Sequence, residues 1–321
     1  MKAIRFDTPG PPEVMKLVEV GVGEPAAGQV RIRHTAIGVN FIDTYHRSGL
    51  YPLPLPSGLG MEAAGIVESV GDGVPQFAVG DRVIYFAGPP AAYATHRILD
   101  ARALVKLPDD IADDQAAALW MKACTVEALV ERCARVQPGQ WVLVPAAAGG
   151  VGILLCQWLK SIGAMVIGTV GSPQKVDIAR EAGADHVLSY AEAPARVRDL
   201  TNGRGVDAVI DGVGQASFES SLDSLTKRGI LVSFGNASGP ISAFDVGLLA
   251  RKGSLFLSRP TLFDYYATPD DVALGTRAVF AKIAAGVLKA HIGQTFALAD
   301  AVACHRALEA RQTVGSSLLI P

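Results

Sequence analysis

Short hydrophobic runs interrupted by glycine and proline dominate the first third of the chain. Residues 30–40 (VRIRHTAIGVN), 63–71 (AAGIVESVG) and 80–86 (GDRVIYF) are rich in the β-branched and aromatic residues that favour strands. The first long helical pattern comes only at 114–134 (DQAAALWMKACTVEALVERCA). This order predicts a barrel-like β domain with helices mostly at its end.

From Gln140 onward, short apolar runs alternate regularly with helical patterns, which indicates a doubly wound parallel sheet. Strands are predicted at 140–146, 165–170, 185–190, 206–213 and 230–236, with helices between them at 150–162, 172–183, 193–202 and 217–229. A further strand at 254–260 is expected at the sheet edge, where it could pair with a second subunit, and a helix is expected at 269–288. The final run, 314–321 (VGSSLLIP), ends in a strand that we expect to rejoin the first domain.

The composition supports two well-packed domains and disfavours nucleic-acid and membrane partners. The chain has 321 residues, of which 50% are hydrophobic and 19% charged. A net charge of −2 without a long Lys/Arg run disfavours nucleic-acid binding. No N-terminal apolar segment and no run of about 18 apolar residues is present, so we expect a cytoplasmic protein with no membrane partner.

The four cysteines carry no spacing that suggests a metal site. Cys124, Cys133, Cys156 and Cys304 are scattered without a CxxC pair. We interpret them as small buried hydrophobic residues in a reducing compartment, rather than as metal ligands or disulfide partners.

Residues 144–155 (VPAAAGGVGILL) place small residues between a predicted strand and a predicted helix. This is the context of a dinucleotide-binding turn, although the G-x-G-x-x-G template puts Ala147 where the first glycine would stand. Gly149 and Gly150 would let the backbone approach a pyrophosphate, whose charge the helix N-terminus attracts. Gly152 would let the helix pack closely on the sheet.

The end of the second strand of this unit indicates the cofactor. An NAD site carries an acidic residue there to bind the ribose 2′-hydroxyl. Residues 169–175 (TVGSPQK) contain no acid, whereas Ser172 and Lys175 can donate to a 2′-phosphate. The sequence therefore predicts NADPH, although Lys175 could instead be a solvated helix residue.

Several segments together resemble the zeta-crystallin-like NADPH-dependent quinone oxidoreductases of the medium-chain dehydrogenase/reductase superfamily. They are AAAGGVG (146–152), NFIDTYHRSGLYP (40–52), GLGMEAAGIVESVG (58–71), GDRV (80–83), GTVGSPQK (168–175), SFGNASG (233–239) and GSSLLIP (315–321). The resemblance covers nearly the whole chain. It implies an α/β fold with a GroES-like β-barrel catalytic domain at 1–123 and 266–321 and a Rossmann NADPH-binding domain at 124–265. It also implies an active site in a cleft between the domains, and usually a homodimer.

The ligands that zinc-containing members of this superfamily use are absent from the matching positions. Those enzymes carry a Cys after the first strands and a His in a GHE element, where this chain has Gly38-Val-Asn40 and Gly60-Met61-Glu62. We therefore expect no bound metal, and interpret Glu62 as a structural hydrogen-bond partner. Without a Lewis acid to polarise a carbonyl, alcohol oxidation is disfavoured.

The resemblance also implies the roles of individual residues. Asn40, Asp43 and Tyr45 would lie in a loop facing the nicotinamide, with Tyr51 nearby and Thr125 at the start of a helix. The remaining cofactor-binding residues would be Gly149, Gly150, Val151 and Gly152 at the pyrophosphate, Gly171, Ser172, Lys175 and Tyr190 at the 2′-phosphate, and Phe234, Gly235, Asn236, Leu257 and Ser258 beside the nicotinamide. Tyr51 could instead only close a proline-rich loop, and Asn40 could only cap a turn.

The activity that the resemblance implies is zinc-independent reduction of small quinones, with direct hydride transfer from NADPH. Orientation would carry most of the catalysis. Asn40 and Tyr51 are the candidate catalytic residues, hydrogen-bonded to the quinone oxygens, and protons could come from solvent. Reduction of α,β-unsaturated carbonyls is the alternative activity. A non-catalytic NADPH- or RNA-binding role, known for relatives, is a further alternative that the absence of a basic stripe disfavours.

Overall fold

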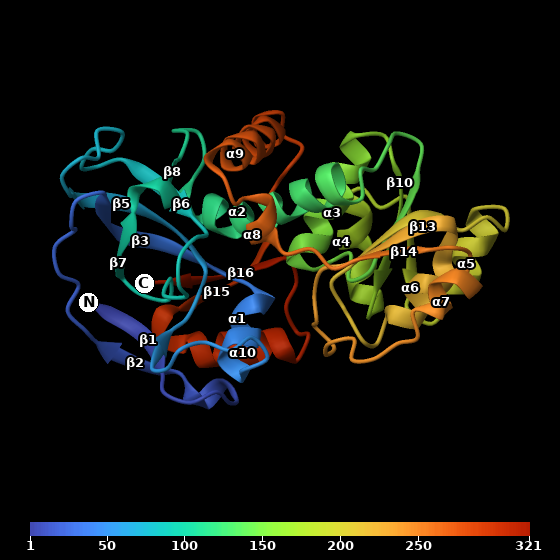
Figure 1. Ribbon diagram of the computed structural model, residues 1–321, viewed down its shortest axis with the longest axis horizontal. Coiled ribbons are helices and arrows are strands. Elements are labelled where there is room, and N and C mark those ends of the chain that lie inside the picture. Colours follow the sequence, from blue (N-terminus) through green and yellow to red (C-terminus); the bar gives the residue numbers. More distant parts are fainter. The chain divides into compact units, whose positions relative to one another are not determined.

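The computed structural model describes residues 1–321 as two compact units. Unit 1 comprises Met1–Met121 and Ala290–Pro321, and unit 2 comprises Lys122–Lys289. The units are described separately below, with the element labels of Figure 1.

Unit 1 is built on two β-sheets. The larger sheet has the order β15-β16-β3-β5-β6-β8, with β7 also paired to β3, and the smaller has the order β2-β1-β4. The strands are β1 (Lys2–Phe6), β2 (Lys16–Glu19), β3 (Gln29–Val39), β4 (Ser57–Gly58), β5 (Glu62–Val70), β6 (Arg82–Tyr85), β7 (His96–Asp100), β8 (Val105–Lys106), β15 (Ile292–Ala297) and β16 (Ser316–Ile320). Its helices are α1 (Phe41–Ser48) and α10 (Ala301–Glu309), together with the first part of α2 (Asp113–Glu127).

Strand β3 is the centre of unit 1, because it pairs with β5, β7 and β16. Its inward positions alternate along the strand, so that Val30 and Ile32 are fully buried in the core while polar residues lie between them. The C-terminal strand β16 pairs antiparallel with β3, Leu318 opposite Gly38. The prediction that the last strand rejoins the first domain is therefore confirmed.

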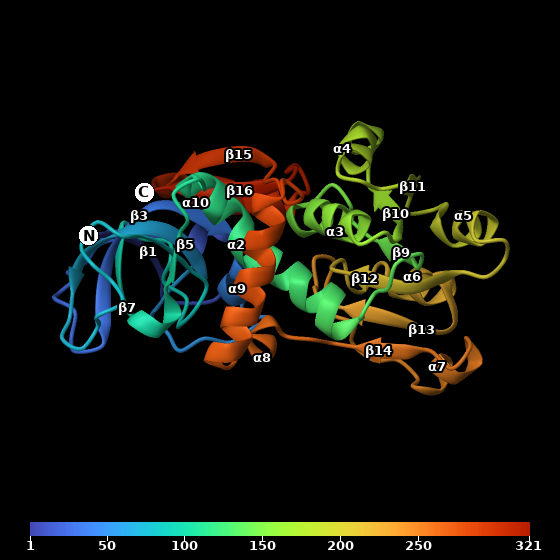
Figure 2. The ribbon, with the colours of Figure 1, turned by 90° about the horizontal axis from the view of Figure 1, so that it is seen from above.

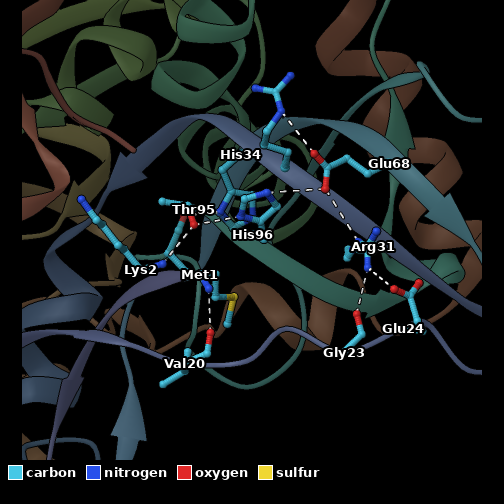
Figure 3. A network of polar contacts seen from close by, with 12 residues as sticks. Met1, Lys2, Val20, Gly23, Glu24, Arg31, His34, Glu68, Thr95 and His96 are labelled. Atoms are coloured by element: carbon cyan, nitrogen blue, oxygen red, sulfur yellow. Dashed lines mark hydrogen bonds and ion pairs between the residues drawn. The ribbon is translucent and has the colours of Figure 1, made fainter.

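Polar contacts tie the first strand of unit 1 to the main sheet (Figure 3). The backbone N–H of Lys2 donates to Thr95 Oγ1 at 3.2 Å. On the main sheet, Glu68 lies 3.7 Å from Arg31 and 3.5 Å from the His96 ring nitrogen. These groups are partly exposed, so we expect them to set register more than to add stability.

Unit 2 is a six-stranded parallel sheet with helices between its strands. Its order, β11-β10-β9-β12-β13-β14, is the 3-2-1-4-5-6 order of the Rossmann fold and can be followed in Figure 2. The strands are β9 (Trp141–Val144), β10 (Met165–Val170), β11 (His186–Ser189), β12 (Val206–Asp211), β13 (Leu225–Ser233) and β14 (Phe256–Ser258). The helices are α3 (Gly150–Ser161), α4 (Val176–Glu181), α5 (Ala193–Leu200), α6 (Phe218–Ser224), α7 (Gly247–Arg251), α8 (Leu262–Tyr265) and α9 (Pro269–Ala284).

The division of the chain differs from the expected one at residues 122–123 and 266–289, which belong to unit 2. Hydrogen bonds explain the difference at 266–289. Tyr266 donates through its hydroxyl to Glu127 at 3.0 Å, and Lys282 Nζ donates to Ser161 Oγ at 2.6 Å. These contacts join α9 and its preceding loop to the helices of unit 2.

Three helices of unit 2, α4, α6 and α9, are shorter than the predicted helices at 172–183, 217–229 and 269–288, and for α6 the structure shows why. Helix α6 ends at Ser224, whereas the sequence pattern predicts a helix to residue 229. The chain becomes extended because Leu225 is buried and pairs with Val206 of β12. Arg228 also has a φ of 62°, which an α-helix does not accept.

No helix has the length and apolar character needed to cross a membrane.

Candidate functional site

The segment predicted as a loop at residues 40–45 is the first turn and a half of helix α1. Asn40 is its N-cap, with φ −129° and ψ 154°, and its backbone N–H donates to Asp43 Oδ2 at 2.9 Å. The helix ends at Gly49, which takes the left-handed conformation with φ 84°. The spacing Asn40-x-x-Asp43 and the terminal glycine are cap signals in the sequence that predict this helix.

Asp43 is completely buried and belongs to a hydrogen-bonded chain in unit 1. Its Oδ2 also accepts the Tyr93 hydroxyl at 2.9 Å, and the Tyr93 oxygen lies 3.0 Å from His305 Nε2. Arg47 Nη1 lies 3.4 Å from His305 Nδ1, and Arg47 Nη2 pairs with Glu309 at 2.6 Å. The Asp43 carboxylate therefore supports the start of α1 and is not presented at the protein surface.

The proton positions in this series of hydrogen-bonded side chains follow from Arg47, at one end of the series. Arginine has only donors, so His305 Nδ1 accepts and His305 Nε2 carries the hydrogen that Tyr93 receives. Burial, with the charge of Arg47 adding to it, lowers the pKa of His305 to about 3. Burial and the Asp43 carboxylate raise the pKa of Tyr93 well above 10. The ring of His305 is thus neutral and the Tyr93 hydroxyl protonated at neutral pH.

Tyr45 and Tyr51 lie next to each other. Tyr45 is on α1 and its ring meets that of Tyr51 edge to face, 5.2 Å between centroids. The Tyr51 backbone N–H donates to the Tyr45 carbonyl at 3.0 Å. Tyr51 is half-buried and closes the loop after α1. It therefore has a structural role in this loop in addition to any catalytic role.

The side chain of Asn40 is held by Glu62 of β5. The sequence predicts Glu62 to be a structural hydrogen-bond partner but does not identify the group that donates to it. Asn40 Nδ2 donates to Glu62 Oε1 at 2.8 Å, and Glu62 Oε2 accepts the Met121 backbone N–H at 2.7 Å. Glu62 is fully buried and faces Gly38 across the β3–β5 pair. A Cβ on Gly38 would lie 2.6 Å from Glu62 Cδ and closer still to Ala117 O, so only glycine leaves room for this carboxylate.

In unit 2, the turn after β9 has the geometry of a dinucleotide-binding turn. Gly149 is the N-cap of the twelve-residue helix α3, and no side chain caps this end. A Cβ on Gly152 would lie 2.8 Å from Ala147 Cα and closer still to Ala146 O. This close approach of helix and turn is what the predicted packing role of Gly152 requires. The left-handed conformation falls on Ala146, with φ 55°, and not on a glycine.

The residues predicted for the 2′-phosphate gather where β10 and β11 end. Gly171 and Ser172 follow β10, and Lys175 ends the short 3₁₀ turn Pro173–Lys175. Tyr190 follows β11, and its ring is 3.9 Å from the position of a Cβ on Gly171. The structure thus brings together these four residues, and no residue from Gly171 to Lys175 is acidic.

The residues predicted beside the nicotinamide lie at the carboxyl ends of β13 and β14. Phe234 donates its N–H to Asp211 O at 2.8 Å, and its ring fills the space a Gly212 side chain would need. Asn236 follows it in the same loop, with Gly235 buried between them. Leu257 and Ser258 are in β14, which pairs with β13.

Arg259, which is not among the residues predicted from the sequence, anchors this edge. Its Nη1 donates to Ser233 O at 2.7 Å, directly before the Phe234 loop. A lone arginine near the carboxyl end of the predicted strand at 254–260 is the signal that could have identified it. All six strands are parallel, so these loops share one edge of the sheet with the α3 N-terminus.

Thr125 is in the last turn of α2, and the prediction that it begins a helix is wrong. No glycine or proline breaks the Ala- and Leu-rich run before it, so the helix starts earlier, at Asp113. A π-helical turn, Ala128–Cys133, follows directly. Cys133 in this turn lies 3.4 Å from Ser258 Oγ.

The cysteines are free thiols. Three are buried and Cys133 is half-buried. Burial raises the pKa of Cys156 and of Cys304 to about 12, which keeps both thiols protonated. The structure contains no group of three or more His, Cys, Asp or Glu side chains that could hold a metal ion.

Comparison with known proteins identifies the family. Residues 26–109 match the family described as "Alcohol dehydrogenase GroES-like domain", and residues 150–262 match "Zinc-binding dehydrogenase". A quinone oxidoreductase of Pseudomonas aeruginosa is 46% identical over 100% of this chain and 99% of its own length. This chain belongs to the quinone oxidoreductases of the medium-chain dehydrogenase/reductase superfamily.

Structural neighbours of this quinone oxidoreductase family member agree with the assignment. The Escherichia coli quinone oxidoreductase complexed with NADPH superposes with a TM-score of 0.97, at 44% identity and with both chains covered completely. The 2-haloacrylate reductase of a Burkholderia species is 42% identical over 97% of this chain and 96% of its own length. The expected α/β fold, a GroES-like domain with a Rossmann domain, is confirmed.

Proposed function

We propose that this protein reduces small quinones with NADPH as the reductant. The observation that carries the proposal is the uncapped N-terminus of α3 at the centre of a 3-2-1-4-5-6 sheet, next to a second strand that ends without an acid. The identity to quinone oxidoreductases and the NADPH complex of the E. coli relative support it.

The residues present fit NADPH. Gly149 is the N-cap of α3, and Gly150, Val151 and Gly152 begin the helix. None of them has a side chain large enough to block a pyrophosphate, and the helix dipole favours its negative charge. Ser172 and Lys175 supply a hydroxyl and a cation for the 2′-phosphate, with Gly171 and Tyr190 beside them. Bound NADPH supplies the hydride for the reaction.

We assign orientation to residues of both units. Asn40, Tyr45 and Thr125, together with Phe234, Gly235, Asn236, Leu257 and Ser258, would contact the nicotinamide half, and Asp43 would act through Asn40. Asn40 and Tyr51 would hydrogen-bond the quinone oxygens as charge develops on them. No buried acid is required for protonation, because solvent can supply protons to a hydroquinone oxygen.

The first test measures initial rates of cofactor oxidation with 1,4-benzoquinone, using NADPH and NADH in parallel and with a chelator added. A fast rate with NADPH that the chelator does not change supports zinc-independent quinone reduction. Tyr51→Phe and Asn40→Ala should each lower kcat/KM by about 10-fold or more, as expected for lost transition-state hydrogen bonds. If both variants keep the wild-type kcat/KM, the roles of these residues are wrong.

Reduction of activated alkenes is a second candidate, favoured by the identity to a 2-haloacrylate reductase. Hydride addition to an α,β-unsaturated carbonyl needs the same cofactor orientation. Comparing 2-chloroacrylate and an alkenal with 1,4-benzoquinone as acceptors distinguishes the two, since the true substrate class has the higher kcat/KM.

We also propose a homodimer formed through β14. This strand ends the sheet, and its Phe256 is 61% exposed. The outer edge of such a partly apolar end strand is a template for pairing with a second copy. Sedimentation of the wild type and of Phe256→Lys tests this, because only the wild type should have the mass of two chains.

A further inference from the structure

We propose that Glu62 is a positioning residue for catalysis, which sets the orientation of the Asn40 side-chain amide. The inference rests on the proposed function, in which Asn40 contacts the reacting groups. It adds a residue that would touch neither cofactor nor quinone and would act only through Asn40.

The chemistry of the pair determines which way the amide faces. Both Glu62 oxygens accept hydrogen bonds, so the Asn40 group that faces Glu62 Oε1 is the donor Nδ2. The other carboxylate oxygen accepts from the Met121 backbone N–H, which lies within α2 and cannot rotate away. Both oxygens are therefore engaged by donors from two different elements.

The surroundings prevent this carboxylate from moving. Glu62 has no solvent exposure, and the space that it occupies exists because Gly38 opposite it has no side chain. Burial of a carboxylate is costly unless its hydrogen bonds are made, which favours the state with both bonds formed. The arrangement is thus rigid on the Glu62 side.

Asn40 is also fixed at its backbone. Its N–H is bound by Asp43, and Asp43 is held by the buried Tyr93 hydroxyl. With the main chain capped at the start of α1, the side chain has only its own torsions left, and Glu62 removes these. A side chain held by two independent supports is pre-organised for binding.

Glu62→Gln separates positioning from simple loss of structure. Glutamine has the same size but only one acceptor oxygen. The immobile Met121 N–H will take that oxygen, so the NH₂ group of the introduced glutamine faces Asn40 and the Asn40 amide must turn over. Asn40→Asp alone places two carboxylates against each other. The double variant Asn40→Asp/Glu62→Gln restores one donor facing one acceptor, with polarity reversed.

The test of the pairing is a double-mutant cycle on the full-length protein, with kcat and Tm measured for each variant. We expect each single variant to lower both Tm and, by about 10-fold or more, kcat with 1,4-benzoquinone. The double variant should regain Tm, because the hydrogen bond is restored, but not kcat, because Asp at position 40 has no N–H to donate to the quinone oxygen. The Kd of NADPH for Glu62→Gln should change by less than about 3-fold, because the predicted 2′-phosphate and pyrophosphate residues are untouched. A double variant whose Tm is no higher than that of the less stable single variant overturns the pairing.

A spectroscopic readout does not depend on activity. In ¹⁵N-edited spectra without cofactor, the Asn40 side-chain amide, identified by its loss in Asn40→Asp, should exchange slowly with solvent in the wild type and rapidly in Glu62→Gln. Unchanged exchange together with unchanged kcat overturns the inference. If the wild type does not oxidise NADPH with 1,4-benzoquinone or any other acceptor offered, the proposed function fails, and amide exchange alone then decides whether Glu62 orients Asn40.

Ser316→Ala is the matched control. Ser316 Oγ donates to Ala118 O at 2.8 Å, so this variant removes another buried hydrogen bond to α2 without touching Asn40. It should lower Tm and leave kcat and amide exchange unchanged. If it reduces kcat as much as Glu62→Gln does, the effect of Glu62 is only a general loosening of α2 and the proposal is wrong.

Discussion

Gly152→Ala is the most direct test of the cofactor turn, because its effect can be worked out from distances. The added Cβ would lie 2.8 Å from Ala147 Cα and 2.9 Å from Ala147 C, about 0.7 Å inside normal carbon packing. Both atoms, and the nearer Ala146 oxygen, belong to the backbone and cannot rotate aside. Helix α3 must therefore move away from the β9 turn.

Two opposing terms give the size of the effect. Overpacking of this kind costs up to about 3 kcal/mol, and we take the upper end because the neighbours are backbone atoms. Alanine returns about 1 kcal/mol through its helix propensity. The net loss is about 2 kcal/mol, which for a domain of this size lowers Tm by about 4–8 °C.

The assay combines thermal unfolding with a fluorescence titration of NADPH. We expect the Tm loss together with a Kd at least about 10-fold higher, since the N-terminus of α3 is displaced. Gly149→Ala is the control for stability. Its φ of −84° accepts alanine and its Cβ would have one neighbour, Ala146 O at 3.2 Å, so Tm should change by only a degree or two. A Gly152→Ala protein with wild-type Tm and wild-type Kd would refute this reasoning.

Three further predictions concern single groups. Lys175→Ala should raise the Kd of NADPH by about 10- to 100-fold and leave that of NADH unchanged, because one charge-assisted contact to the 2′-phosphate is lost; equal effects on both cofactors would contradict the assigned role. Tyr93→Phe should lower the free energy of unfolding in urea by about 2–4 kcal/mol, since the buried Asp43 and His305 each lose a partner. A loss below about 1 kcal/mol would show that the hydrogen bonds of Tyr93 to Asp43 and His305 are not formed. The free energy of unfolding should also decrease as the pH is lowered below about 6.5, the ordinary pKa of histidine. Burial lowers the pKa of His34 and of His305 to about 3 in the folded protein, so the unfolded chain binds more protons. This stability is complete above about pH 6.5 and is lost toward pH 3, by up to about 1.4 kcal/mol per pH unit for each histidine. Equal urea midpoints at pH 7.5 and 5.5 would exclude it.

The alternating half of the chain was predictable because its elements are locally encoded. Strand β10 has the bounds that the apolar run 165–170 predicted, and α3 begins at Gly150 as its glycine turn indicated. Parallel strands buried on both faces are continuous apolar runs, and these are easy to recognise in a sequence. Family resemblance added the fold of the first unit, which its short strands alone left as a barrel-like domain.

The misassigned elements depend on contacts with distant residues. Helix α6 ends at Ser224 because Leu225 pairs with β12, and a local helical pattern carries no information about that pairing. The loop and helix after β14 join unit 2 through contacts such as Tyr266 with Glu127, 139 residues apart. Helix α1 is different, because Asn40, Asp43 and Gly49 are cap signals that could have been read from the sequence.

The sequence by itself determined the doubly wound sheet, the small-residue turn before α3 and the absence of an acid after β10. Each of these depends on residues close together in the chain, whose conformations or chemistry are constrained by neighbours. Only the tertiary structure decided what holds Asn40. Glu62 is 22 residues away and reaches Asn40 because Gly38 lies opposite it in the β3–β5 register. The bonds from His305 to Tyr93 and on to Asp43 likewise cross 212 and 50 residues. Burial makes these long-range hydrogen bonds obligatory, because a polar group removed from water must find its partner within the fold.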